Sequence, residues 1–175
     1  MKDKIKAFYA QYDAEVEKLM SELASYNDAQ LNQKPADGGW SALQTMHHLI
    51  LVEENSLAYV RKKMSFNPQF EKPGPRAWFR NVLLLVSMWS PIKFKAPKSA
   101  GAELIPSTSS LAETRDKWHT IRQEWKLFFE NIPAELSEKA VYKHPRAGRI
   151  SWLQMVRFFR AHFKRHRLQA LRAVS

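Results

Sequence analysis

The chain has 175 residues, of which 45% are hydrophobic and 26% are charged, and only five are glycine. This composition suits one globular domain and excludes a disordered, collagen-like or glycine-repeat chain. The formal net charge is +11, and no cysteine is present, so a disulfide framework, a thiolate metal site and a cysteine nucleophile are all excluded.

Basic charge is concentrated in two parts of the sequence. Residues 139–175 hold ten Lys or Arg and no acidic residue, so the first 138 residues carry 18 basic and 17 acidic groups. Within those, residues 61–102 hold nine basic residues and a single acidic one, Glu71. The N-terminal segment lacks the apolar core of a secretory signal, and the longest apolar stretch, residues 82–89, is too short to cross a bilayer. We therefore expect a cytoplasmic protein without a transmembrane segment.

The first two helices are predicted from apolar residues spaced three and four positions apart. One such stripe covers residues 5–26 and predicts a helix that ends near Asn27. After a turn-rich loop at residues 34–39, Ser41 is placed to cap a second helix that reaches about Met64.

A long connection, residues 65–109, follows the second helix and contains six of the nine prolines. A connection of this length usually has structure or function of its own, and we expect a short helix within residues 77–89. Three lysines border that helix: Lys93, Lys95 and Lys98. Two interpretations remain open. The segment either packs Trp78, Phe79 and Trp89 onto the bundle as a crossover cap, or docks onto a membrane surface or a partner.

Two further helices are predicted in the second half. Ser110 precedes Glu113 by three residues, which is the spacing of a capping box, and the helix that follows is stopped by Pro133. Ser151 is placed to cap a fourth helix that runs to the C-terminus. Residues 142–149 resemble a hairpin but are short and contain a proline, so no strand is predicted.

Four long helices in a chain of this size predict an all-α fold, a four-helix bundle that forms a single domain over residues 1–175. The long connection at about 65–109 indicates a crossover topology, with the short extra helix inside the crossover.

Two histidines in the fourth helix, His162 and His166, are four residues apart and therefore lie on one helix face. They continue the apolar stripe that begins at Trp152, and Gln169 follows them on the same face. Burying two imidazoles costs free energy unless each finds a partner, and one metal ion satisfies both. The alternative is a pair of interior histidines that are hydrogen-bonded to neighbouring helices.

A catalytic divalent ion usually takes three protein ligands and a water molecule. The second helix offers the adjacent His47 and His48, which point about 100° apart, and either could be the third ligand. Gln44 lies one turn before His48 and Asn55 lies two turns after it. With Gln169, these residues are candidates to contact a metal-bound water or a substrate.

Short motifs near the middle and the end of the chain resemble a known family. The motifs are Gly39-Trp40-Ser41, then His48 and Glu53, and finally His162, His166 and Gln169. Together they resemble the DinB/YfiT-like superfamily of metalloenzymes, from the loop before the second helix to the C-terminus. Residues 65–109 look like an insertion of a subgroup.

The resemblance implies a four-helix bundle with a crossover, commonly a homodimer, that binds nickel or zinc through three histidines. Carried over by position, the ligands are His48, His162 and His166. This choice of His48 over His47 rests on the analogy and not on spacing.

Glu53 lies about 140° around the helix from His48, within the apolar stripe of the second helix. We interpret it as a structural residue that pairs with an arginine or a buried backbone group, in preference to a catalytic residue.

Three neutral imidazoles would leave a divalent ion its full charge and an open position, where water or a thiol becomes a nucleophile near neutral pH. The resemblance implies a thiol, because related members are thiol S-transferases or a thiol-dependent isomerase that use low-molecular-weight thiols. Without cysteine in the chain, such a thiol must come from a small molecule. We expect a small-molecule substrate, with an anionic one favoured by the basic charge. A metal-dependent hydrolase is the alternative.

The basic fourth helix supports a competing hypothesis. Its cations could follow a phosphate backbone, interleaved with Phe158 and Phe163. They are Arg157, Arg160, Lys164, Arg165, Arg167 and Arg172. A charged helix face is more often solvated, so we do not expect nucleic-acid binding. A bundle that only binds a protein partner is a third alternative.

Overall fold

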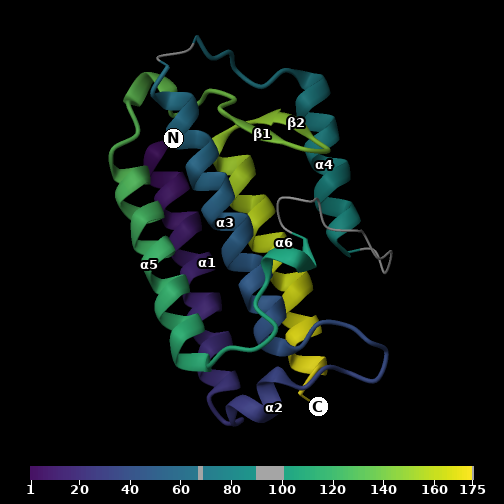
Figure 1. The fold of residues 1–175 in the computed structure, drawn as a ribbon. Coiled ribbons are helices and arrows are strands. Elements are labelled where there is room, and N and C mark those ends of the chain that lie inside the picture. Colours follow the sequence, from purple (N-terminus) through teal and green to yellow (C-terminus); the bar gives the residue numbers. More distant parts are fainter. Residues whose placement is uncertain (67–68, 90–100, 175) are drawn as a thin grey trace.

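The computed structural model describes residues 1–66, 69–89 and 101–174 (Figure 1). Within these residues no helix is long and apolar enough to cross a membrane. In chain order the elements are α1 Lys2–Leu23, α2 Asp28–Asn32, α3 Ala42–Met64, α4 Pro75–Trp89, η2 Ala102–Leu104, α5 Leu111–Glu130, η3 Ala134–Leu136, β1 Tyr142–His144, β2 Gly148–Ile150 and α6 Trp152–Arg172.

Four long helices, α1, α3, α5 and α6, form the bundle. Helices α5 and α6 each pack against both α1 and α3, so α1 and α3 lie on one diagonal. Figure 1 shows that α3 and α5 run in the same direction, while α6 runs opposite to α3. The chain must therefore return along the length of the bundle between α3 and α5. The predicted all-α bundle with a crossover and a short extra helix is confirmed.

Three of these helices begin with a capping box. The Ser41 hydroxyl accepts a hydrogen bond from the Gln44 N–H, and the Gln44 side chain accepts one from the Ser41 N–H. The same reciprocal pair forms at Ser110 with Glu113 and at Ser151 with Gln154. A cap of this kind is worth about 1 kcal/mol, and it explains why all three helix starts could be predicted.

Aromatic side chains fill the space between the four helices. Trp118, Trp125 and Trp152 are fully buried. The Trp125 ring centroid lies 5.1 Å from that of Phe129 on the same helix and 5.6 Å from that of Phe159 on α6. Such pairs combine large apolar burial with favourable ring geometry, and the pair of Trp125 with Phe159 holds α5 against α6.

The first helix is shorter than predicted, because α1 ends at Leu23 and not near Asn27. Asn27 instead caps the short helix α2, where its side chain accepts a hydrogen bond from the Gln30 N–H. The sequence pattern continued to Tyr26 because that side chain still packs against the core from the turn between the two helices.

A small hairpin precedes α6, where no strand was predicted. Strand β1 pairs antiparallel with β2, with Tyr142 opposite Ile150. The turn is held by His144, whose Nδ1 accepts hydrogen bonds from the backbone N–H groups of Arg146 and Ala147. Gly148 has φ +75°, which a glycine adopts without strain. The His144 acceptor and the left-handed backbone conformation of Gly148 thus stabilise the hairpin, although its residues have low strand propensity.

The crossover helix α4 packs on α6 and β2. The expectation that its large aromatic residues pack onto the bundle is wrong, since Trp78, Phe79 and Trp89 are 60%, 57% and 76% exposed. The buried residues of α4 are Asn81 and Leu84. The three bordering lysines of the sequence prediction lie outside the described residues.

Candidate metal centre

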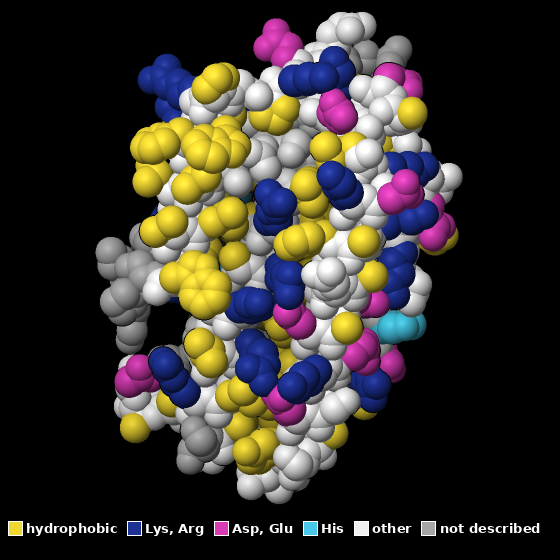
Figure 2. Space-filling view, turned by 180° about the vertical axis from the view of Figure 1, so that it is seen from behind, with side chains coloured by type: hydrophobic (Ala, Val, Ile, Leu, Met, Phe, Trp, Pro, Cys, Tyr) yellow, Lys and Arg dark blue, Asp and Glu magenta, His cyan; other side chains and the backbone are white. Residues whose placement is uncertain are grey.

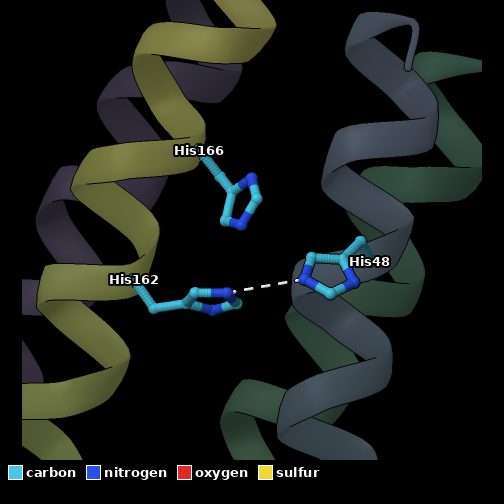
Figure 3. A group of neighbouring side chains, drawn as sticks. All are labelled: His48, His162 and His166. Carbon is cyan, nitrogen blue, oxygen red and sulfur yellow. Dashed lines mark hydrogen bonds between the residues drawn. The ribbon is translucent and has the colours of Figure 1, made fainter. Parts of the chain in front are cut away.

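Three histidines meet between α3 and α6 (Figure 3). His48 lies in the second turn of α3, whereas His162 and His166 lie in the second half of α6. Because the two helices are antiparallel neighbours, the beginning of α3 lies beside the end of α6 (Figure 1). Helix pairing thus brings together residues that are 114 positions apart in the chain.

The three side chains each turn a ring nitrogen toward the others. One nitrogen from each histidine lies within 4.8 Å of those of the other two. The His48 Nε2 and His162 Nε2 atoms are 3.4 Å apart. Two imidazole nitrogens bound to one tetrahedral ion at about 2.0–2.1 Å are separated by about 3.3 Å. The spacing of the cluster therefore fits a shared divalent ion.

Gln169 fixes the orientation of His166. The Nδ1 atom of His166 lies 2.9 Å from the Gln169 Oε1 atom. An amide oxygen only accepts, so Nδ1 carries the proton and Nε2 keeps its lone pair. A partner of this kind on the far ring nitrogen is the usual support of a metal-binding histidine.

Aromatic rings border the cluster on two sides. The Trp40 ring centroid lies 4.8 Å from that of His48 and 6.5 Å from that of His166, nearly parallel to the latter. On α6, Phe158 stacks on His162 at 5.4 Å. These contacts limit the rotation of the imidazoles and keep water away from those faces.

Burial also keeps His162 and His166 uncharged. Removal from water lowers the pKa of His166 to about 3, and the neighbouring His48 acts in the same direction. The pKa of His162 falls well below its usual value for the same reason, with a further contribution from His166. Both imidazoles are therefore neutral at physiological pH and have lone pairs for a metal ion.

The other histidine of α3, His47, points away from the cluster. Its Nε2 lies 3.0 Å from the Ser109 hydroxyl and 3.2 Å from the Thr114 hydroxyl, at the start of α5. Adjacent residues on a helix point about 100° apart, so only one of the two can face α6. The geometry therefore places His48, and not His47, beside the α6 histidines.

The three weaker candidates from the sequence are not gathered at one place. Gln169 contacts the cluster directly through His166. Gln44 uses its side-chain oxygen in the α3 cap with Ser41. Asn55 is exposed, two turns further along α3 than His48.

Two residues that border the cluster were not identified as site residues from the sequence, Trp40 and Phe158. A signal existed for each. Trp40 directly precedes the Ser41 cap of the histidine-bearing helix α3, and Phe158 lies four residues before His162 on one face of α6.

A second buried polar cluster lies on another face of α3. Glu53 Oε1 accepts hydrogen bonds from Tyr12 Oη at 2.7 Å and from Trp118 Nε1 at 2.9 Å. Arg122, only 1% exposed, lies 3.4 Å from the same oxygen and also pairs with Asp13. Burial and the negative charge of Glu53 raise the pKa of Tyr12 well above its usual value. The predicted pairing of Glu53 with an arginine is confirmed.

Comparison with known proteins agrees with this architecture. Residues 11–170 match the family model of the DinB superfamily, a range that covers most of the bundle and all three clustered histidines. Comparisons with curated proteins and with solved structures give no match. With nearly the whole chain matched and the helical bundle observed, the protein belongs to the DinB superfamily.

Proposed function

We propose that this protein binds one nickel or zinc ion through His48, His162 and His166, and is a metal-dependent enzyme that transfers a low-molecular-weight thiol to an electrophile. The observation that carries the proposal is the convergence of three imidazole nitrogens within 4.8 Å. Nitrogen ligands of this kind suit late divalent transition metals rather than magnesium or calcium.

The donor set also suits catalysis. Three protein ligands leave a tetrahedral ion one open position, whereas purely structural sites are usually closed by four. When bound, such an ion supplies Lewis acidity that makes a coordinated thiol or water nucleophilic near neutral pH.

The residues around the cluster have supporting roles in this proposal. Gln169 holds the Nδ1 proton of His166 and so directs the opposite nitrogen toward the centre. Trp40 and Phe158 hold the rings of His48 and His162 and exclude water from their faces. The chain has no cysteine, so the thiol is a small molecule that enters from outside. A metal-dependent hydrolase would use the same ion with water.

The charge pattern of α6 favours a small substrate over nucleic acid. Arg160 and Lys164 pair with Glu15, and Arg167 pairs with Glu22, both on α1. These cations are neutralised within the molecule, so α6 lacks the continuous row of unpaired cations that tracks a phosphate backbone. An anionic small molecule and a homodimer remain parts of the proposal, the latter tested by sedimentation equilibrium.

Metal analysis tests the first half of the proposal. Protein purified without a metal-affinity tag should contain about one nickel or zinc ion per chain. His48→Ala should remove the metal, whereas the matched control His47→Ala, a change at the adjacent residue of the same helix, should keep it. If the wild-type protein contains no metal and neither ion raises its melting temperature, the proposal is wrong.

Thiol consumption tests the second half. The metal-loaded protein should accelerate the reaction of a low-molecular-weight thiol such as glutathione or cysteine with a chloroarene or epoxide, and His48→Ala should abolish the acceleration. A protein that binds metal but never consumes thiol would refute thiol transfer and leave the metal site intact. Hydrolysis of ester or amide substrates by that protein would then support the hydrolase.

A further inference from the structure

The outward face of α4 is apolar along the whole helix. Its large exposed side chains include two tryptophans and a phenylalanine, and the set is Trp78, Phe79, Leu83, Val86 and Trp89. Figure 2 shows hydrophobic side chains gathered on the left of the molecule, the side on which α4 lies in that view. An exposed apolar patch of this kind on a water-soluble bundle usually marks an interaction surface.

The exposed residues do not serve the packing of α4. At 100° per residue they fill one continuous arc, away from the buried Asn81 and Leu84 that face α6 and β2. Helix α5 is built differently, because its one large exposed hydrophobic residue in the described chain is Leu127. Helix α4 thus buries Asn81 and Leu84 and exposes its large apolar residues on the outward side.

The charge around this face has one sign. Helix α4 contains Arg76 and Arg80, both exposed, and no acidic residue. The sequence from Lys72 to Ala102 has no Asp or Glu at all, and its lysines at 93, 95 and 98 lie outside the described residues. On the helical wheel the two arginines adjoin the arc beside Leu83. Cations therefore border the apolar face along its Leu83 edge.

We propose that the α4 face binds the surface of an anionic lipid bilayer. An interfacial helix with tryptophan, phenylalanine and leucine on one side and arginine at its border places its apolar side chains at the headgroup boundary and its cations among the lipid phosphates. A second copy of this chain fits less well, because a two-fold contact through α4 would bring the arginines of both copies together.

The attachment of α4 suits such a role. Arg165 on α6 donates from Nη1 to the Ser87 and Met88 carbonyl oxygens, each at 3.3 Å, at the C-terminal end of α4. The helix is thereby held on the bundle while its opposite side stays exposed. This inference is independent of the metal site.

Vesicle sedimentation tests the proposal. The full-length protein is mixed with vesicles of phosphatidylcholine, either alone or with phosphatidylserine added. We expect binding to the phosphatidylserine vesicles that weakens as salt is raised, and much weaker binding to phosphatidylcholine alone. Failure to bind the anionic vesicles, or equal binding to both, would overturn the proposal.

A matched pair of variants localises the contact. Val86 is 62% exposed on α4, and Leu127 is 58% exposed on α5. Val86→Glu should reduce binding about tenfold or more, because a carboxylate replaces an apolar group at the interface, while Leu127→Glu should not. Circular dichroism and the melting temperature establish that both variants are folded.

Two results would contradict the assignment to lipid. Equal loss of vesicle binding in Val86→Glu and Leu127→Glu would show that net charge, and not α4, controls binding. A wild-type dimer that Val86→Glu converts to monomers, with no lipid binding by either, would identify a second copy of the chain as the occupant.

Discussion

The bundle interior holds two polar clusters on different faces of α3, and they avoid unpaired charge in opposite ways. At Glu53, a carboxylate contacts two tyrosines, a tryptophan N–H and the guanidinium of Arg122 within the protein, and in the described chain Arg122 Nη2 is the one atom of this cluster that is buried without a hydrogen bond. At His48, the three facing groups are all imidazoles, and among the residues that the structure describes no acidic group belongs to the cluster. The first cluster pairs its opposite charges within the fold, while the second has the composition of a site that is completed by a cation.

The Glu53 cluster should be the more costly to disrupt. Arg122→Met leaves the Glu53 carboxylate buried without its cation, and we expect the free energy of unfolding to fall by about 3–5 kcal/mol. Urea denaturation measures the loss. The control is Arg115→Met, the same change on the same helix at an exposed pair with Glu17, where about 1 kcal/mol or less is expected.

A double variant sharpens this first prediction. If the loss comes from a stranded carboxylate, Glu53→Gln combined with Arg122→Met should recover part of the stability. Equal losses in Arg122→Met and Arg115→Met would mean that the Glu53 cluster is not a charge-matched unit.

At the histidine cluster, a substitution should change the metal affinity more than the stability. Gln169→Leu removes the acceptor for the His166 Nδ1 proton, and we expect the dissociation constant for zinc to rise about 10–100-fold. Competition with a chromogenic chelator measures the constant. Gln123→Leu, which removes an exposed glutamine 3.2 Å from His119 on α5, is the matched control and should leave the constant unchanged. An unchanged constant in Gln169→Leu would mean that His166 is oriented by other contacts.

His144 is a buried imidazole of a third kind, because backbone N–H groups of its own turn satisfy its Nδ1. Burial lowers its pKa to about 4, so the folded protein resists protonation there while the unfolded chain takes up the proton below about pH 6.5. This contribution to stability is therefore constant above pH 6.5 and is lost as the pH falls from 6.5 toward 4.

The variant His144→Asn keeps an acceptor for the turn but does not titrate. Between pH 7 and pH 5 the wild-type protein should lose about 2 kcal/mol more stability than this variant, measured by urea denaturation at each pH. Parallel pH profiles for the two proteins would contradict the assigned pKa direction.

The smallest effect is expected at His166 in metal-free protein. His166→Leu strands no charge, and the freed Gln169 side chain is partly exposed to water, so the unfolding free energy should change by less than about 1 kcal/mol. With zinc at 100 times its dissociation constant, the wild-type protein should gain about 2.7 kcal/mol and the variant none. If His166→Leu lowers the unfolding free energy of the metal-free protein as much as Arg122→Met does, the histidine cluster is a structural network like the Glu53 cluster.

Local spacing explains how much of the molecule could be predicted. The starts of α3, α5 and α6 rest on interactions within three residues, at Ser41, Ser110 and Ser151, and all three were predicted. The pairing of His162 with His166 likewise depends only on the turn of one helix. The hairpin was missed because it depends on the side chain of His144 and on a left-handed glycine, and not on strand propensity.

The sequence did not predict which face of a helix packs against which neighbour. Periodicity alone left His47 and His48 equivalent, and only the packing of α3 between α5 and α6 separates them. The sequence left open whether the crossover tryptophans pack onto the bundle or dock elsewhere, and the structure shows that α4 buries a different side.

The sequence by itself thus determined the four amphipathic helices, their caps and the change from apolar to polar residues along the buried face of α6. Each of these depends on residues within one or two helical turns. Tertiary structure decided which histidine of α3 meets α6, how Glu53 finds Arg122 and which side of α4 stays exposed. Those outcomes depend on the direction and rotation of packed helices whose contacting residues are 69 to 114 positions apart, and no local spacing carries that information.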